Sequence, residues 1–510
     1  MNVKPPALII AFIIILIACN QEENLYRPTW ESLKEHEVPE WLLDAKFGIY
    51  AHWGPYSVPA YINEKYARRM HQKGNKVNEY HIENYGGPVE YPYHEFIPEF
   101  KAEHFDADEW AELIERSGAR YAGFAVVHHD GFLLWDSKVN PWNAGNVGPH
   151  QDLFGNLTEA LRERGIKTIA TFHHLRTFNW YLPDDEEYLQ ELKREGSALF
   201  DPEFADLYWN EYTGEYEDFL NEWKAKVREV IDKYNPDVLW FDGGRFQEDL
   251  ALQNTLEVLA HHYNSEIRNT GSKVEVLNKL PGTTLTFNFP REVGVLTFEE
   301  GRDRKGYLDW PWIDDQRISL DAWGYIQGQT YKSSNEILDG LIDRVSRGGG
   351  LLLSLSPKAD GSINEPQKKI LSDIGDWLKI NGEAIYGTRK WKIQTEGKDD
   401  ELLIEKDNFN KWDFKNCTSE DIRFTYKENT LYAIALGIPE DEKIRIGSLS
   451  CQTRISDSNI IQRIELLGAG EVPWKRDNEA LIIDLPGEVP NEYALTFKIA
   501  VDGNLDNSIQ

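Results

Sequence analysis

The chain has 510 residues, with 55 Lys and Arg against 86 Asp and Glu, and a formal net charge of −31 at pH 7. This length exceeds the size at which a single hydrophobic core keeps growing, so two domains are expected. The charge argues against nucleic acid as a partner and against electrostatic docking to acidic membranes, because phosphates would be repelled. It also disfavours a strongly anionic substrate, unless a local basic pocket overrides the average.

The N-terminus has the pattern of an export signal. Lys4 precedes the apolar run ALIIAFIIILIA, which is too short for a secure membrane-spanning helix, and Cys19 and the polar string NQEE follow. LIAC resembles the lipobox of bacterial lipoproteins, which implies cleavage before Cys19 and acylation of its thiol; the alternative is an ordinary signal peptide with an incidental Cys. We therefore expect a signal peptide over 1–18, a tether over 19–30, and an exported lipoprotein anchored in the outer membrane, on its periplasmic or cell-surface side.

From about residue 45 to 385, short apolar runs alternate with longer helical patterns, which is typical of βα units around a parallel sheet. Amphipathic helices are expected over 106–119 and 335–349. Seven strands are expected, at 47–53, 121–128, 168–174, 238–242, 274–278, 295–299 and 350–356. The economical interpretation is an α/β fold, a (β/α)8-like TIM barrel over 31–387 in which an eighth strand would be degenerate.

The character of the chain changes after INGEAIYGTRKW. Short alternating strands with polar turns, such as ELLIEK, LYAIALG and YALTFKIAV, predict a C-terminal antiparallel β-sandwich over 388–510. Cys417 and Cys451 lie in this part, and they either form one disulfide or remain free thiols. Two isolated Cys cannot build a closed structural zinc site, and no CxxC or HExxH string occurs.

Polar residues end several of the predicted strands, where the active site of such a barrel is expected. The residues at these ends are His52, His128, His129, Asp130, His173, His174, Asp242 and Glu299. Any one of them could be an ordinary rim residue, but five strand ends together indicate a pocket. Neighbouring side chains on a strand point to opposite faces, so His128 and His129 cannot easily chelate one metal ion unless the loop turns between them. Neutral imidazoles around a pocket are better suited to a ring of hydroxyls.

Asp242 lies in DVLWFDGG, where an apolar strand carries a carboxylate to its end and two glycines leave the approach open. Such a carboxylate can act as a nucleophile if hydrogen bonds keep it ionised, while a second, protonated carboxyl donates to the leaving oxygen. A Gly-flanked turn Asp is the alternative. The separation of the two carboxyls would set the stereochemistry, at roughly 5 to 5.5 Å for retention and about 6.5 to 9.5 Å for inversion.

Several segments, in order and over roughly residues 28 to 392, resemble the α-L-fucosidases of glycoside hydrolase family 29. They are KFGIYAHWGPYSVPAY at 46–61, FDADEWAELIERSGARYAGFAVVHHDGFLLWDS at 105–137, PDVLWFDGG at 236–244, LIDRVSRGGGLLLSLSPKADGSI and WLKINGEAIYGTRKW. The resemblance implies a retaining exo-hydrolase that needs neither metal nor cofactor and forms a covalent glycosyl-enzyme intermediate. It also implies a C-terminal β-sandwich and a fucosylated oligosaccharide or polysaccharide as substrate.

Carried over residue by residue, the resemblance implies Asp242 as the nucleophile and a set of fucose-binding residues. That set is His52, Glu64, His128, His129, His173 and Trp323. Two positions depart from the family: the Trp that often follows the sugar-binding Glu is Lys65 here, and Val127 replaces a Lys that commonly precedes the histidine pair.

The acid/base position varies across the family. Glu299 in TFEEGR is our choice because VLTF delivers it along a buried strand. Glu300 is the runner-up, since alternation would turn it away from the pocket.

The expected function is therefore hydrolysis of terminal α-L-fucose. Two alternatives remain open. One keeps the fold and changes the sugar, to an L-galactoside or a sulfated algal fucoside, and is motivated by Lys65 and Val127. The other is a surface lipoprotein that binds glycans through the same pocket without catalysis.

Overall fold

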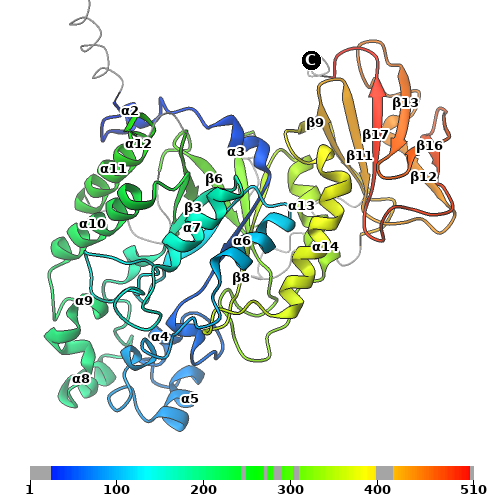
Figure 1. Ribbon diagram of the computed structural model, residues 1–510. Helices are drawn as coiled ribbons and strands as arrows, with labels where there is room; N and C mark the ends of the chain where they lie inside the picture. The colour runs from blue at the N-terminus through cyan, green and yellow to red at the C-terminus, as the bar shows by residue number, and fades with distance from the viewer. Residues whose placement is uncertain are drawn as a thin grey trace, which may run out of the picture.

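The computed structural model describes residues 25–242, 249–268, 273–279, 289–301, 309–397 and 417–505. Eight parallel strands close into a barrel in the order β1 to β8, which confirms the predicted fold (Figure 1). The strands are β1 (Phe47–Ala51), β2 (Tyr121–Val127), β3 (Lys167–Phe172), β4 (Val238–Phe241), β5 (Glu275–Lys279), β6 (Val295–Glu299), β7 (Trp312–Arg317) and β8 (Gly350–Leu355).

Strand β7 is the one that the sequence pattern did not predict, and it is not degenerate. It reads WIDDQR, is buried along its whole length, and pairs in parallel with β6 and β8. Asp314 points to the outside of the barrel, where the Arg344 guanidinium of α13 (Ser334–Ser346) binds its carboxylate. A strand stabilised by buried ion pairs lacks the apolar run by which the other seven were recognised.

Helices surround the barrel (Figure 1). The predicted helices at 106–119 and 335–349 are present as α6 and α13; Asp106 caps α6, and Ser333 and Glu336 form a capping box on α13. Helix α6 spans Ala107–Arg116. The other helices are α2 (Trp30–Leu33), α3 (Glu40–Ala45), α4 (Tyr66–Arg69), α5 (Lys76–Tyr85), α7 (Leu153–Glu163), α8 (Glu186–Arg194), α9 (Ala205–Tyr208), α10 (Tyr216–Tyr234), α11 (Asp249–Tyr263), α12 (Ser265–Arg268) and α14 (Glu365–Asn381).

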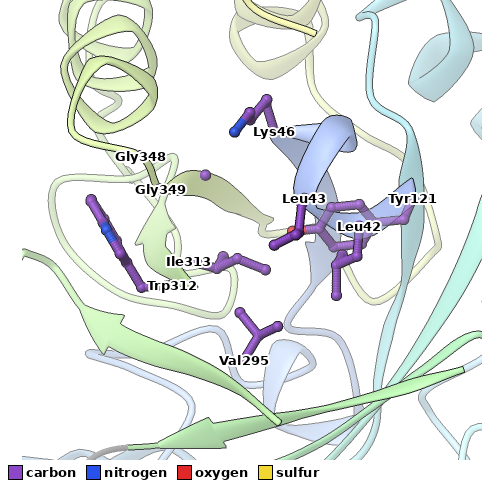
Figure 2. A pocket seen from close by; sticks show the side chains of 10 residues that line it. Leu42, Leu43, Lys46, Tyr121, Val295, Trp312, Ile313, Gly348 and Gly349 are labelled. Carbon is purple, nitrogen blue, oxygen red and sulfur yellow. The ribbon is translucent and has the colours of Figure 1, made fainter. Parts of the chain in front are cut away.

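The N-terminal end of the barrel is closed by α3. Leu42 and Leu43 of this helix lie over the starts of the strands, where Tyr121, Val295 and Ile313 meet them around a small cavity (Figure 2). The cavity measures about 20 Å³, which is room for about one water molecule. A ligand of any size must therefore enter the barrel from its other end, where the strands finish.

The C-terminal part is antiparallel, as predicted, with a core of its own. One sheet has the order β14-β13-β17-β11-β10-β9 and the other the order β12-β16-β15. Their strands are β9 (Arg389–Glu396), β10 (Ile422–Lys427), β11 (Thr430–Ala435), β12 (Lys443–Ile446), β13 (Ile461–Leu466), β14 (Gly470–Glu471), β15 (Trp474–Arg476), β16 (Leu481–Asp484) and β17 (Leu495–Val501). The predicted strand ELLIEK lies outside the described residues. Cys417 and Cys451 are both free thiols.

Residues 1–24, which hold the predicted signal peptide and Cys19, lie outside the described residues. In the part of the chain that is described, no helix combines the length and apolarity needed to cross a membrane.

Candidate active site

The carboxyl ends of the first three barrel strands bring three histidines together. His52 follows β1, His128 follows β2 and His173 follows β3, and all three side chains are buried. Their ring centroids lie 4.8 to 5.6 Å apart, from 4.8 Å for the pair of His128 and His173 to 5.6 Å for the pair of His52 and His128. Parallel strands of a barrel finish at the same end, so residues far apart in sequence meet there.

Asp242 follows β4 and lies beside this cluster. Its Oδ2 is 3.2 Å from His173 Nε2, its Oδ1 accepts a hydrogen bond from Lys279 Nζ, and its backbone N–H donates to the Phe172 carbonyl at 2.9 Å. Burial raises the pKa of Asp242, but the charge of Lys279 and the hydrogen bond from His173 outweigh it and hold this pKa well below its usual value. Asp242 is therefore ionised at neutral pH.

Lys279 ends β5 and joins two carboxylates. Its Nζ contacts Asp242 and lies 3.1 Å from Glu299 Oε2, at the end of β6. The nearest oxygens of the two carboxyl groups therefore lie within the span of two N···O contacts that meet at one ammonium group. Burial lowers the pKa of Lys279, but the neighbouring acidic groups, Asp242 first, raise it above its usual value, so the bridging group stays cationic.

A third carboxyl, Asp315 of β7, lies inside the barrel and is 1% exposed. The Tyr50 hydroxyl donates to its Oδ1 at 2.8 Å. Burial raises the pKa of Asp315 well above its usual value. The charge of Lys279 opposes this shift, whereas the neighbouring Asp242 and Glu299 carboxyls add to it. Asp315 is therefore neutral and adds no negative charge to the site.

His52, His128 and His129 are neutral as well. Burial, and then the neighbouring imidazoles, lower the pKa of His52, His128 and His129 well below the usual value. His52 Nδ1 is 2.8 Å from Ser354 Oγ, and His129 Nδ1 is 2.6 Å from the His173 carbonyl oxygen. A neutral imidazole can donate with one nitrogen and accept with the other, as hydroxyl ligands require.

His128 and His129 do not point apart as strand alternation predicts. Strand β2 ends at Val127, and the chain then turns, with the Gly131 N–H bonded to the His128 carbonyl at 3.1 Å. The two rings consequently lie 4.4 Å apart, both buried. Alternation fails because it applies only while the backbone is extended.

Within the described residues, His52, His128 and His173 form a group whose ligand atoms lie within 4.8 Å of one another, close enough to hold a metal ion. In the sequence His128 and His129 are adjacent, whereas the fold alone brings His52, His128 and His173 together. In the structure, however, His173 contacts Asp242 and His52 contacts Ser354, so this cluster equally suits a ligand rich in hydroxyls.

Glu64 and Trp323 come from two loops and meet beside His52. Glu64 is buried, and its Oε2 accepts a hydrogen bond from the Trp323 backbone N–H at 3.3 Å. The Trp323 ring lies 5.1 Å from the His52 ring. All six residues that the resemblance implied for sugar binding therefore gather at the end of the barrel that carries Asp242.

Glu300 faces a different environment from Glu299. It has a positive φ of 53°, its Oε1 accepts from the Arg317 N–H at 3.1 Å, and Lys332 Nζ lies 3.4 Å away. Its carboxylate is thus held by cations that do not contact Asp242, whereas Glu299 shares Lys279 with Asp242.

Comparisons with known proteins agree with this geometry. The Alpha-L-fucosidase family model matches residues 13–383, and the model of the Alpha-L-fucosidase C-terminal domain matches residues 415–500. Tissue alpha-L-fucosidase of Rattus norvegicus is 31% identical over 96% of this chain and 96% of its own length, and that of Homo sapiens is 31% identical over 94% and 92%. The chain belongs to the alpha-L-fucosidase family. It is a glycoside hydrolase, as its sequence predicted.

Solved structures of the family have the same fold. The Thermotoga maritima alpha-fucosidase in complex with fucose superposes with a TM-score of 0.71 at 28% identity, covering 93% of this chain and all of the other. An alpha-fucosidase from Paenibacillus thiaminolyticus, at 21% identity and a TM-score of 0.67, shares the fold.

Sequence reasoning missed three residues of this fucosidase site: Lys279, Asp315 and Tyr50. Lys279 follows directly after the predicted strand 274–278, so the strand-end argument that found Asp242 could have found it. Asp315 lies on β7, the strand that the sequence pattern did not predict. Tyr50 lies within the apolar strand β1, where an aromatic residue is expected for packing alone.

Proposed function

We propose that the enzyme is a retaining, exo-acting α-L-fucosidase that hydrolyses terminal α-L-fucose through a covalent intermediate. The observation that carries the proposal is the contact of both Asp242 and Glu299 with the single Lys279 ammonium. Two carboxyl groups that share one cation lie beside the same small volume, and the two-step, double-displacement chemistry needs a nucleophile and a proton donor on one sugar unit.

In the first step, an Asp242 oxygen attacks the anomeric carbon while the bond from that carbon to the leaving oxygen breaks, and Glu299 gives its proton to that oxygen. In the second step, Glu299 takes a proton from water, whose oxygen attacks the same carbon and releases Asp242. Asp242 is suited to its part because its low pKa keeps it ionised.

The closed end of the barrel favours an exo mode. Below Asp242 the interior is filled by Trp240, Tyr50 and Asp315, and α3 closes the far end. A pocket with a filled floor admits the end of a glycan and not its middle. The neutral His52, His128 and His129, with Glu64, offer donors and acceptors for the hydroxyls of one sugar.

The decisive experiment replaces Asp242 by Gly, with Asp309→Gly, at a side chain that is 97% exposed, as the matched control. We expect turnover of an aryl α-L-fucoside to fall by on the order of 10⁴ or more, with the fold retained by circular dichroism. Azide should restore turnover in D242G and give a fucosyl azide of inverted configuration, and NMR of the native reaction should show α-L-fucose as the first product.

Undiminished activity in D242G would refute the assignment of Asp242 as the nucleophile. Formation of β-L-fucose as the first product would refute a retaining mechanism. Faster turnover of an aryl L-galactoside or of a sulfated fucoside than of the plain fucoside would show that the substrate carries that related sugar instead. Fucose binding without turnover of any activated substrate would leave a glycan-binding lipoprotein.

We further propose that the enzyme is exported and held to the outer membrane by a lipid on Cys19, on its periplasmic or cell-surface side. The support is the LIAC string that follows the apolar run. Fractionation of cells that express the full chain and its Cys19→Ser variant tests this: the parent should sediment with membranes and the variant should not. A parent found in the soluble fraction would contradict it.

A further inference from the structure

A second concave site lies at the opposite end of the barrel from Asp242, where the barrel meets the sandwich. It is a shallow groove, largely open to solvent, of about 420 Å³. Its walls come from α3, from the starts of β2 and β3, from the turn that leads into β9 and from the end of β10. The lining residues are Trp41, Asp44, Ala45, Arg120, Gly165, Lys167, Tyr386, Gly387 and Lys427.

The groove is basic although the chain carries a net charge of −31. Three cations line it, against the single carboxylate of Asp44. Asp44 is already paired with Arg389 at 2.6 Å, and Lys167 is paired with Asp237 at 2.8 Å. Arg120 and Lys427 have no carboxylate within ion-pair distance among the described residues, so their charge is available to a ligand.

Aromatic rings hold two of these cations in place. The Arg120 guanidinium lies over the Tyr386 ring at 4.1 Å, and Lys167 Nζ lies over the Trp41 ring at 5.3 Å. Tyr386 is itself fixed, because its hydroxyl donates to the Gly118 carbonyl at 2.6 Å. Lys427 Nζ lies close to Gly387, next to Tyr386, so Arg120 and Lys427 flank one turn. Arg120, fixed in this way, loses little side-chain entropy when it binds an anion.

We propose that this groove binds an acidic segment of a glycan, through sulfate ester or carboxylate oxygens held between Arg120 and Lys427. A hollow that presents two available cations fits a discrete oxyanion on a sugar, whereas a membrane of anionic lipids would be repelled by the rest of the surface. Bound here, a polymer would be retained by the enzyme while the other end of the barrel acts on a chain terminus.

The test compares the full-length enzyme with the double variant R120Q/K427Q and with a matched control, R194Q/K193Q. The control removes the same charge from the exposed surface of α8, far from the groove (Figure 1). The probes are dextran sulfate, polygalacturonate and uncharged dextran, with isothermal titration calorimetry at low and at moderate salt. We expect the parent and the control to bind one or both acidic polymers and not dextran, and R120Q/K427Q to bind at least tenfold more weakly.

The acidic polymer that binds identifies whether sulfate or carboxylate is preferred. Equal binding by the parent and R120Q/K427Q would overturn the proposal, as would binding of phosphatidylglycerol vesicles without binding of either polymer. The kcat and KM for a small aryl fucoside should be the same in all three proteins. Because binding is measured without turnover, its loss in the variant and a failure of the proposed hydrolysis can be told apart.

Discussion

Lys279 is the residue on which the electrostatics of the catalytic site depend. It is 10% exposed and contacts both Asp242 and Glu299, so a partly buried pair of carboxyl groups is accompanied by one fixed positive charge. Without that charge, two carboxylates this close would oppose each other's ionisation. Here the protein keeps Asp242 ionised and leaves Asp315, one layer below, neutral.

Replacing Lys279 by Met should shift the pH dependence of catalysis. The pKa of Asp242 is depressed mainly by Lys279 against the effect of burial, so loss of the charge should raise it. The acidic limb of the kcat/KM profile on an aryl fucoside should then move to higher pH, by about one unit or more. Lys279→Arg keeps the charge and should leave the limb near its native position; an unmoved limb in K279M would contradict the role.

Glu299→Gln and Glu300→Gln separate the two acid/base candidates. Loss of the acid/base should leave kcat/KM little changed for a substrate with a good leaving group, but it should lower kcat/KM for a natural glycan by on the order of 10² or more. It should also lower kcat for both substrates, because no base then takes the proton from water in the second step. We expect this difference between the two substrates in E299Q. Azide should restore turnover of the activated substrate and give a fucosyl azide of retained configuration. E300Q should show no such difference between substrates, because Glu300 is bound by Arg317 and Lys332. If only E300Q showed the difference, Glu300 would be the acid/base.

At the scale of elements, β5 joins the active site to a buried acid at the other end of the barrel. Glu275, at its start, is fully buried; it accepts from the Tyr263 hydroxyl of α11 at 3.0 Å and from the Val276 N–H at 2.8 Å. Burial raises the pKa of Glu275 to about 8. Glu266 of α12 and His36 face it, and burial lowers the pKa of His36 to about 4, so that imidazole supplies no charge.

Glu275→Gln should change how stability depends on pH. The folded state keeps the proton up to about pH 8, whereas the unfolded chain loses it near its ordinary pKa of about 4.5. The native protein therefore loses stability as pH rises from about 4.5 to about 8, and the neutral Gln should remove up to about 4 kcal/mol of that loss. Urea unfolding between pH 5 and pH 8 measures how the free energy of unfolding changes with pH, and Glu31→Gln at an exposed position is the control. Parallel pH profiles for E275Q and the parent would contradict the assignment.

At the scale of the whole molecule, a buried ion pair fastens the sandwich to the barrel. Arg423 of β10 donates from Nε to Asp343 of α13 at 2.7 Å, and both side chains are almost fully buried. Arg347 shares the same carboxylate at 3.1 Å. Trp377 of α14 adds a hydrogen bond to the Ala494 carbonyl at 2.9 Å. The relative position of the two parts is thus set by specific polar contacts.

Arg423→Leu should destabilise the protein strongly because it leaves the buried Asp343 with one cation fewer. We expect a loss of about 3 kcal/mol, seen in thermal and urea unfolding. Arg445→Leu, which breaks the exposed pair with Asp441 on the same sandwich, should have little measurable effect. Similar melting temperatures for the two variants would show that the buried pair does not hold the interface.

The sequence by itself determined the barrel, the sandwich and the strand ends that carry His52, His128, His173, Asp242 and Glu299. It could do so because apolar strands and their polar ends follow from local chain geometry. It failed at β7, whose polar side chains are stabilised by partners such as Arg344, 30 residues away.

Only the tertiary structure decided which charges share a partner. That Lys279 joins Asp242 to Glu299, that Asp315 stays neutral, and that His128 and His129 both enter the pocket depend on how eight strands close and where each chain turns. The basic groove has the same origin, since Arg120 and Lys427 are 307 residues apart in sequence and meet only when the barrel and sandwich pack. Burial and proximity are properties of the closed fold, and no short stretch of sequence contains them.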